Sequence, residues 1–244
     1  MIYKMRKHFF NENFFEIIDT EEKAYWLGFI AADGYITSRK NTVGITLDQK
    51  DSDHLLKFLK NIDSNSTKLH LRTGRYDENN PITNKCSVYL YSNKMSQDLF
   101  KLGIKPDKST SLQELSITLS DDLINHFIRG YFDGDGCVFE SKTKYGKNKE
   151  KICLTAGFTF VGTFDFLTYI NQKLPFSVKN LRKDKRTQGS YTLYICSKKR
   201  FFIMEEFLYK NSNVWLTRKK EKCENIKNKL NSGSETIPQG STLK

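Results

Sequence analysis

Two aspartates stand in matching surroundings 102 positions apart, and they are the side chains best suited to chemistry in this sequence. Asp33 lies in YWLGFIAADGY, residues 25–35, and Asp135 lies in FIRGYFDGDGC, residues 127–137. Two carboxylates brought close together repel each other unless a cation lies between them. Carboxylate and carbonyl oxygens are the ligands that Mg²⁺ and Ca²⁺ take in proteins. The repeated pair therefore predicts a divalent-metal site.

Both segments are predicted to be helices that meet along faces of small residues. Gly28 and Ala32 are four positions apart and share one helical face, as do Gly130 and Gly134. Small residues at this spacing let two helix backbones approach closely. We therefore expect the two helices to pack on each other, with the two aspartates side by side at the end of the contact.

Each helix is expected to end at its Asp-Gly pair, with Gly34 and Gly136 in the left-handed conformation that closes many helices. A carboxylate there lies at the negative end of the helix, beside carbonyls without intrahelical partners. A divalent cation would relieve both the repulsion and the unpaired carbonyls. Metals held in this way activate water and stabilise the leaving oxygen in phosphodiester hydrolysis, so phosphodiester chemistry is expected.

The flanks of the two segments repeat as well, which indicates two copies of one unit. Alternating apolar residues predict strands and helical spacing predicts helices. In the first copy these are the strand 41–47, the helix 51–62, the strands 67–73 and 86–92, and the helix 95–103. In the second copy they are the strand 151–160, the helix 163–174, the strands 176–182 and 190–197, and the helix 199–209. The expected class is α+β, with two αββαββα units.

The chain is expected to divide at the connection between the copies. Residues 1–102 form the first repeat, and residues 103–120, with Pro106 and several Ser and Thr, form a linker. Residues 121–230 form the second repeat, including a basic C-terminal helix. Residues 231–244 are rich in Ser and Gly and are expected to be a disordered tail.

Composition points to a polyanionic partner. The formal net charge is +12 and 38% of the residues are hydrophobic, with 18 Phe and 12 Tyr, as in a globular basic protein. A basic surface kept only for solubility is the alternative reading of the charge. Five cysteines without knuckle spacing predict free, mostly buried thiols. With no signal peptide and no membrane span, we expect an intracellular protein without a membrane partner, in the cytoplasm, nucleoid or organelle matrix where its target lies.

Other metal sites fit the sequence poorly. The four histidines, His8, His54, His70 and His126, are scattered, which argues against an HNH nuclease. Ligands for an EF-hand are missing after DGDG, and the cysteines lack the spacing of a zinc site.

WLGFIAADG and IRGYFDGDG resemble the two copies of the LAGLIDADG signature of homing endonucleases. The surrounding repeat is similar to that family over roughly residues 15–230, as in single-chain, two-repeat members. The resemblance implies signature helices at the central interface and two antiparallel sheets that form a saddle over the DNA major groove. It also implies site-specific cleavage of both strands of a long, asymmetric target, with short 3′ overhangs, as in intron homing.

The resemblance carries roles to particular residues. Asp33 and Asp135 match the metal-binding, catalytic acids, and the carbonyls of Ala32 and Gly134 match the backbone ligands. The other signature acid is present only once, as Asp133, where the first copy has Ala31, so Asp133 is expected to be a structural or solvated carboxylate.

Two polar positions complete the implied site. Gln49 matches the polar residue that follows the second strand, and in the second copy Gly162 leaves that role empty. Lys198 matches the family's catalytic lysine where the fourth strand meets the last helix, with Lys199 as its neighbour. Asn93 stands there in the first copy. For Lys198, a phosphate contact or a solvated charge is the alternative.

DNA contacts are expected on the outward sheet faces and at hairpin tips. If Leu69 and Leu71 face the helices, alternation turns the polar residues between them outward. The candidates are Arg39, Lys40, Lys68, His70, Arg72, Arg75, Lys85, Ser87, Tyr89, Tyr91, Lys108, Lys142, Lys151, Cys153, Thr155, Lys179, Arg182, Lys183, Arg186, Thr192 and Tyr194. For each of them a solvated surface is the alternative.

The resemblance thus predicts a monomeric endonuclease that acts on double-stranded DNA and needs no protein partner. Mg²⁺ is the expected cofactor, with Mn²⁺ as a substitute and Ca²⁺ binding without cleavage. The alternatives are an RNA-binding splicing helper (maturase) and a DNA-binding protein that does not cut. Retention of both Asp33 and Asp135 favours the nuclease, because a pure binder has no need of two mutually repelling acids.

Overall fold

The computed structural model describes residues 9–37, 41–75, 81–105, 118–145, 151–179, 181–185 and 187–232. Of residues 144, 145, 151 and 152 only the backbone is described. Among the sequence-predicted contacts, Arg39, Lys40, Lys108 and Arg186 lie outside the described residues, as does the side chain of Lys151.

The first repeat is an antiparallel four-stranded sheet with helices on one face. Its sheet has the order β1-β2-β4-β3. Its elements are α1 (Glu21–Asp33), β1 (Gly34–Thr37), β2 (Thr42–Asp48), the 3₁₀ turn η1 (Gln49–Asp51), α2 (Ser52–Asn61), β3 (His70–Gly74), β4 (Thr83–Tyr91) and α3 (Asn93–Lys101).

The second repeat follows the same plan, with the sheet order β5-β6-β8-β7. Its elements are α4 (Asp121–Asp135), β5 (Gly136–Tyr145), β6 (Lys151–Gly162), α5 (Phe164–Lys173), β7 (Arg182–Lys183), β8 (Tyr191–Cys196), α6 (Lys198–Tyr209) and α7 (Thr217–Asn231). The predicted α+β class with two αββαββα units is confirmed, and α7 is added to the second unit.

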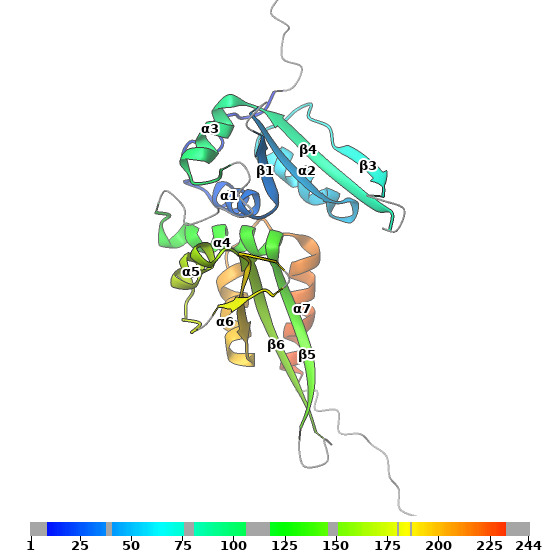
Figure 1. The fold of residues 1–244 in the computed structure, drawn as a ribbon, viewed down its shortest axis with the longest axis vertical. Helices are drawn as coiled ribbons and strands as arrows, with labels where there is room; N and C mark the ends of the chain where they lie inside the picture. Colours follow the sequence, from blue (N-terminus) through cyan, green and yellow to red (C-terminus); the bar gives the residue numbers. More distant parts are fainter. Residues whose placement is uncertain are drawn as a thin grey trace, which may run out of the picture.

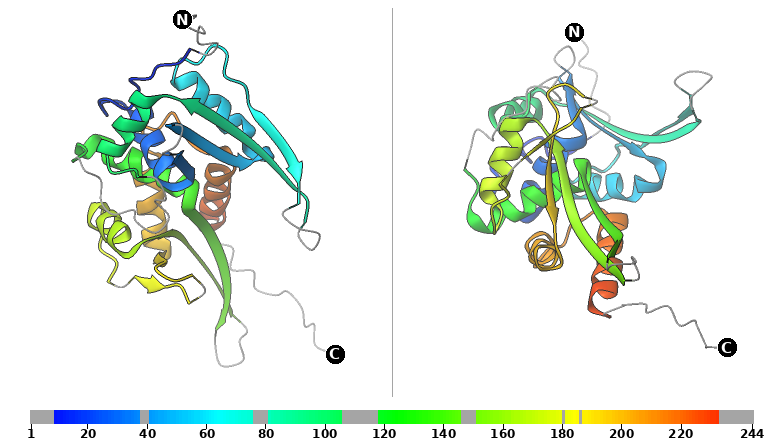
Figure 2. Two further views of the ribbon diagram at one scale, coloured as in Figure 1. Left: turned by 45° about the horizontal axis from the view of Figure 1, so that its top comes forward. Right: turned by 60° about the horizontal axis from the view of Figure 1, so that its bottom comes forward.

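The helices that carry the Asp-Gly pairs lie against each other at the centre of the molecule. Figure 1 shows α1 directly above α4, with the first repeat on one side and the second on the other. The hairpins β3–β4 and β5–β6 extend outward from this centre (Figure 2). Of all pairs of elements from different repeats, α1 and α4 make the most extensive contact. The central part of each helix is buried, residues 24–32 in α1 and 126–133 in α4. The buried part of α1 is largely apolar, whereas that of α4 includes His126, Arg129 and Asp133.

Serine and threonine start several of the helices that cover the sheets. Ser92, Thr163 and Ser197 stand just before α3, α5 and α6, and each side-chain oxygen accepts a hydrogen bond from a backbone N–H in the first turn. Such caps satisfy donors that the helix itself leaves unpaired. Behind the caps, apolar residues at helical spacing pack on the sheets; on α2 these are Leu55, Phe58 and Leu59.

Three local expectations were wrong. Of the expected strand 176–182 only Arg182 is extended, since β7 is just Arg182–Lys183. Leu71 lies on the helix side of the sheet, opposite the buried Cys86, but it is 63% exposed and not packed against a helix as expected, because β3 is an edge strand with almost every residue exposed. All five cysteines are free, but only Cys86 and Cys223 are buried, so the expectation of mostly buried thiols was wrong; Cys153 is exposed, as expected for a residue on the outward face.

None of the helices within the described residues is long and apolar enough to span a bilayer.

Candidate metal and nucleic-acid site

The seam between α1 and α4 is built on two equivalent glycines. A Cβ on Gly28 would overlap the backbone carbonyl oxygen of Phe127, and a Cβ on Gly130 would overlap that of Tyr25. The two helix backbones are therefore closer than any side chain at these positions would allow. The predicted close packing of the two helices along their small residues is confirmed by this geometry.

The seam brings the two aspartates to one place. A Cβ on Gly134 would lie 3.4 Å from the Oδ2 atom of Asp33, and Gly134 is the residue just before Asp135. Burial raises the pKa of the Tyr131 hydroxyl well above its usual value, and the charges of both Asp135 and Asp33 raise it further. The hydroxyl of the buried Tyr131 is therefore close enough to both carboxylates for their charges to raise its pKa. Asp33 is half-buried and Asp135 is exposed.

Both helices end in a way that the sequence did not predict. Gly34 has φ −77° and ψ 164°, and Gly136 has φ −91° and ψ 167°, so both are extended rather than left-handed. The chain passes directly from helix to strand at each site. Glycine is needed for space instead: a Cβ on Gly34 would lie 2.8 Å from the Ile30 carbonyl oxygen, and one on Gly136 would lie 2.6 Å from that of Phe132.

A buried lysine that the sequence analysis did not place in the site lies at the end of α4. Lys219, from the first turn of α7, is 6% exposed. Its Nζ donates hydrogen bonds to the carbonyl oxygens of Phe132 (2.7 Å), Gly134 (2.9 Å) and Gly136 (2.7 Å). Burial lowers the pKa of Lys219 to about 8, although the charges of three nearby aspartates oppose this shift. One ammonium group therefore satisfies the carbonyl end of the signature helix.

One signal in the sequence could have found this lysine. Residues 218–220 read RKK and open a helix, where cations oppose the helix dipole. Such a placement needs compensating partners. The structure provides them, since Arg218 pairs with Asp51 at 2.9 Å and Lys219 with the carbonyls of α4.

Asp133 forms a buried hydrogen-bonded chain across the two repeats. It is 1% exposed, and its Oδ2 accepts hydrogen bonds from the Tyr25 hydroxyl (2.7 Å) and the Leu216 backbone N–H (2.8 Å). Because the Tyr25 hydroxyl donates to Asp133, it must accept from the Nε2–H of His54, which lies 2.9 Å away. Of the two readings left open for Asp133, the structural one is confirmed and the solvated one is wrong.

The connection between α6 and α7 is fastened to both signature helices. Glu21 at the start of α1 accepts hydrogen bonds from the backbone N–H groups of Asn213 (2.6 Å) and Val214 (3.0 Å). Arg129 of α4 is fully buried and donates to the carbonyls of Val214 (2.8 Å) and Leu208 (2.9 Å). Arg129 also pairs with Glu21 at 2.7 Å. These contacts fix the segment that leads into Lys219.

Comparisons with known proteins agree with this geometry. A sequence model described as the LAGLIDADG-like domain matches residues 122–157, which contain the second Asp-Gly pair. The meganuclease I-LtrWI bound to target DNA is 12% identical, with a TM-score of 0.58, over 90% of this chain and 93% of the other. The meganuclease I-AabMI bound to uncleaved DNA is 11% identical, with a TM-score of 0.57, over 85% and 90%.

Residues 122–157 match the LAGLIDADG-like domain, and the chain has the fold of the LAGLIDADG structures. The resemblance seen in the two Asp-Gly segments is thus confirmed, with the solved structures establishing the fold. Among curated proteins, the DNA-directed RNA polymerase subunit Rpo1C of Methanocaldococcus jannaschii is 31% identical over 114 residues, or 47% of this chain. The chain spans only 12% of the length of that protein.

Within this LAGLIDADG fold, Lys198 lies in the wrong place for the role expected of it. Its Nζ donates to the carbonyl oxygen of Leu230 at 2.7 Å, near the end of α7, whereas Lys219 is in the first turn of that helix. Lys219 and Leu230 are eleven residues apart on α7, which separates them by about 16 Å along the helix axis. β8 runs away from the end of the sheet at which Asp135 lies, so Lys198, which follows β8, is far from Asp135. The helix α6 then runs back, and the segment after α6 reaches the acids. Lys199, the neighbouring alternative, sits in the same first turn of α6.

Gln49 lies at the Asp33 end of the first sheet. Gly34 pairs with Ile45, so continuing the ladder places Asp33 level with Thr46, and Gln49 is three residues further along. Gln49 opens η1 and is exposed. In the second repeat Gly162 ends β6, so no side chain takes the equivalent position. Asn93 and Lys94 open α3, where Lys94 pairs with Asp98.

The register of the first sheet places most of its predicted contacts on the face away from the helices. Paired residues share a face, so the pairs Arg72–Lys85 and His70–Ser87 lie on the same side as Tyr89 and Tyr91. Ser87 is only 6% exposed, because its hydroxyl is hydrogen-bonded to that of Thr46 at 2.8 Å. The exposed residues Lys68 and Arg75 flank β3.

The second sheet shows the same division. Cys153, Thr155, Thr192 and Tyr194 share the outward face, while Phe158 and Ile195 face the helices. Lys142 lies on the opposite face of the sheet. It shares that face with Glu140, whose carboxylate pairs with Lys229 of α7. Lys179, Arg182 and Lys183 are exposed beside the edge of the sheet.

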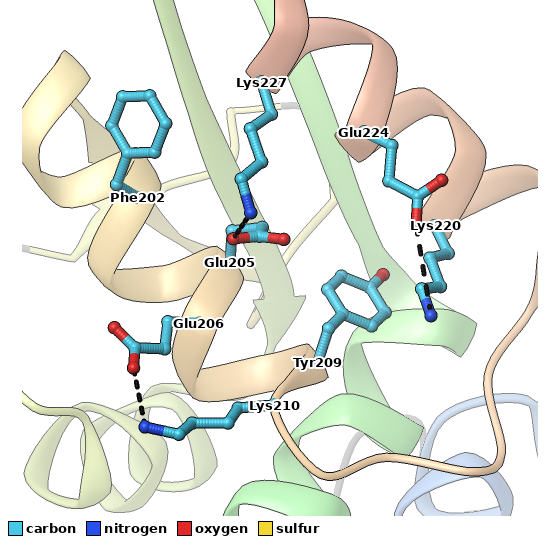
Figure 3. A pocket seen from close by; sticks show the side chains of 8 residues that line it. All are labelled: Phe202, Glu205, Glu206, Tyr209, Lys210, Lys220, Glu224 and Lys227. Atoms are coloured by element: carbon cyan, nitrogen blue, oxygen red, sulfur yellow. Dashed lines mark hydrogen bonds and ion pairs between the residues drawn. The ribbon is translucent and has the colours of Figure 1, made fainter. Parts of the chain in front are cut away.

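A groove between α6 and α7 is a poor candidate for the site. Its volume is about 480 Å³, and Figure 3 shows its charged side chains pointing toward one another. The pairs are Glu205–Lys227 (2.8 Å), Glu206–Lys210 (2.9 Å) and Glu224–Lys220 (4.0 Å). Because each charge already has a partner, the groove offers no free charge that would attract a ligand.

Proposed function

We propose that the chain is a site-specific endonuclease that hydrolyses double-stranded DNA with divalent metal ions held by Asp33 and Asp135. The observation that carries the proposal is the α1–α4 seam, which places two carboxylates at one site at the ends of two helices. The related folds belong to meganucleases bound to DNA, including I-SmaMI with cleaved DNA at a TM-score of 0.58, 12% identity, 91% coverage of this chain and 93% of the other.

The chemistry of this end of the seam fits Mg²⁺. Two carboxylates and the carbonyl of Ala32 are hard oxygen donors, the kind that Mg²⁺ prefers, whereas the expected Gly134 carbonyl already accepts a hydrogen bond from Lys219 at 2.9 Å. The buried ammonium group of Lys219 interacts with Asp133 and with both of these acids. A cation bound between the two acids would reduce their mutual repulsion. No larger cluster of His, Cys, Asp and Glu in the described residues offers another metal site.

A bound Mg²⁺ would supply Lewis acidity and an activated water at the scissile phosphate. The protein's own residues have distinct tasks in this scheme. Asp33 and Asp135 hold the metal, and the exposed Gln49 lies where it can orient water on the Asp33 side. Lys219 fixes the end of α4 and adds positive charge beside a phosphate that becomes more negative during the reaction. The outward sheet faces bind the DNA major groove, and the cut leaves short 3′ overhangs.

Cleavage of a random duplex library tests the proposal without a known target. The full chain is incubated with the library and Mg²⁺, the cleaved ends are sequenced, and one enriched duplex becomes the substrate. Asp33→Asn and Asp135→Asn should each bind this duplex with Ca²⁺ present and fail to cut it with Mg²⁺. Asp165→Asn, an exposed acid on α5, is the matched control and should cut normally.

Two outcomes would contradict the proposal. If Asp33→Asn or Asp135→Asn cuts at the normal rate, the acids are not the metal ligands of the reaction. If the wild-type chain binds an enriched duplex tightly but no divalent metal supports cutting, the chain is a binding protein with this fold rather than a nuclease.

A further inference from the structure

An ordered row of side chains crosses the outward face of the second sheet. The ring of Phe139 on β5 stacks on the ring of Tyr194 on β8, with centroids 5.1 Å apart and planes 23° apart. On the same ring of Tyr194 lies the guanidinium of Arg182 from the edge strand β7, with its Cζ 3.9 Å from the ring centroid. Three strands thus contribute to one continuous row.

A glycine in the intervening strand makes room for this row. Gly157 of β6 pairs with Phe139, and a Cβ on Gly157 would overlap the Ile195 carbonyl oxygen of β8 and lie 2.8 Å from the Phe139 ring. Without a side chain on Gly157, the phenyl ring can lie across β6 and reach Tyr194. The row therefore depends on a position that a larger residue would block.

The first sheet contains a related arrangement. Gly44 of β2 pairs with Tyr35, and a Cβ there would overlap the Tyr35 ring. The Tyr35 hydroxyl is hydrogen-bonded to Tyr89 of β4, and the Tyr89 ring lies 5.1 Å from that of His70 on the edge strand β3. In each repeat, an aromatic row lies over a glycine and ends at a nitrogen-bearing side chain from the edge strand. This side chain is His70 in the first repeat and Arg182 in the second.

We infer that Arg182 is a base-reading residue, held over the ring of Tyr194 so that its N–H groups face a guanine in the DNA major groove. This inference rests on the proposed function. An exposed arginine ordinarily samples many rotamers, and ordering it on binding costs free energy. A guanidinium stacked on an aromatic ring is already ordered, and its planar N–H edge remains available for O6 and N7 of guanine, the commonest specific contact of arginine with DNA.

The arrangement predicts unequal discrimination by the two sheets. His70 offers one ring N–H and lies tilted at 57° to Tyr89, so it cannot make the bidentate contact. Arg182 can, and it should give the second half-site a sharper preference at its base pair than His70 gives the first.

Selection of bound sequences measures this directly. The full-length protein is equilibrated with a random duplex pool in Ca²⁺, bound duplexes are sequenced, and preferences are derived for each base pair. The variants are Arg182→Lys, which keeps the charge, and Tyr194→Leu, which removes the support beneath the guanidinium. Lys183→Ala is the matched control, because Lys183 is the exposed neighbour on the opposite face of β7. Thermal unfolding checks that each variant is folded.

Arg182→Lys should reduce the preference for guanine at one base pair by about 5- to 150-fold and leave the other positions unchanged. Tyr194→Leu should weaken the same preference by about 2- to 5-fold. Lys183→Ala should lower affinity for all sequences alike.

An unchanged profile for folded Arg182→Lys, while the wild type still selects and cuts a sequence, would overturn the inference but leave the proposed function standing. If the wild type enriches no sequence at all, both fail together.

Discussion

The two signature helices are alike on the face where they meet and differ on the face turned toward α6 and α7. At the seam, Gly28 of α1 corresponds to Gly130 of α4. On the other face, α4 carries His126, Arg129 and Asp133, all buried, at the positions where α1 has Ala24, Leu27 and Ala31. One copy of the unit therefore has a buried polar face and the other an apolar one.

The difference follows from what each helix supports. Arg129 and Asp133 hold the irregular segment between α6 and α7, whose backbone groups need hydrogen-bond partners when buried. The corresponding face of α1 packs with apolar side chains, as its buried residues show. The shared face brings together the two acids of the proposed metal site, and the divergent face positions Lys219.

Arg129→Met should give the largest loss of stability. The substitution removes a fully buried guanidinium, which leaves Glu21 without its ion-pair partner and the carbonyls of Leu208 and Val214 without donors. Breaking such a pair costs about 3–5 kcal/mol. Leu27→Met, at the equivalent position of α1, conserves volume and should cost less than about 1.5 kcal/mol. Urea unfolding measures both, and equal losses would remove the distinction between the two faces.

Among substitutions outside the acid pair, Lys219→Met should have the largest effect on cutting. It removes the ammonium group from the acid end of α4, and loss of one charge-stabilising donor lowers a rate by about 10²- to 10³-fold. Lys198→Met is the matched control, since Lys198 binds the Leu230 carbonyl at the other end of α7. Cleavage of an enriched duplex is timed, and binding confirms folding. A defect confined to Lys198→Met would restore the original assignment.

Two buried histidines, one in each repeat, should respond differently to acid. Burial lowers the pKa of His54 from 6.5 to about 3, and the positive charges of Lys57, Arg218 and Lys219 contribute. Unfolding therefore takes up a proton between pH 6.5 and about 3, so stability falls as the pH falls through this window. From pH 6.5 to 4.5 the loss from His54 should be about 2.3 kcal/mol.

His54→Gln should remove most of this acid sensitivity in urea unfolding at the two pH values. The pKa of His126 is also lowered by burial and by Arg129, but Glu21 opposes that shift. His126→Gln should therefore change the acid sensitivity less. If His126→Gln has the larger effect, the burial of His54 has been misjudged.

Gly28→Ala and Gly130→Ala should destabilise the protein to a similar extent, because each Cβ would overlap a backbone carbonyl of the opposite helix. Forcing a methyl into this contact costs at least about 1–3 kcal/mol. Both variants should also slow cutting, since they move the acids apart. Unequal losses of stability would show that the seam is not symmetric.

Much of this arrangement could be predicted from the sequence, because the repeated small residues and Asp-Gly pairs specify a helix contact by spacing alone. Lys219 was missed because its place depends on the direction of α6 and on contacts 83 to 87 residues apart. Leu71 was misjudged because alternation gives a face but does not reveal whether a helix covers it. The extended conformations of Gly34 and Gly136 depend on the strands that follow directly.

Manganese binding tests the central claim most directly, because Mn²⁺ can be located by its anomalous scattering. Crystals of the full chain soaked in Mn²⁺ should show a peak between the carboxylates of Asp33 and Asp135, and crystals of Asp33→Asn or Asp135→Asn should lose it. A strong peak elsewhere, or the two carboxylates lying too far apart to share an ion, would contradict the account.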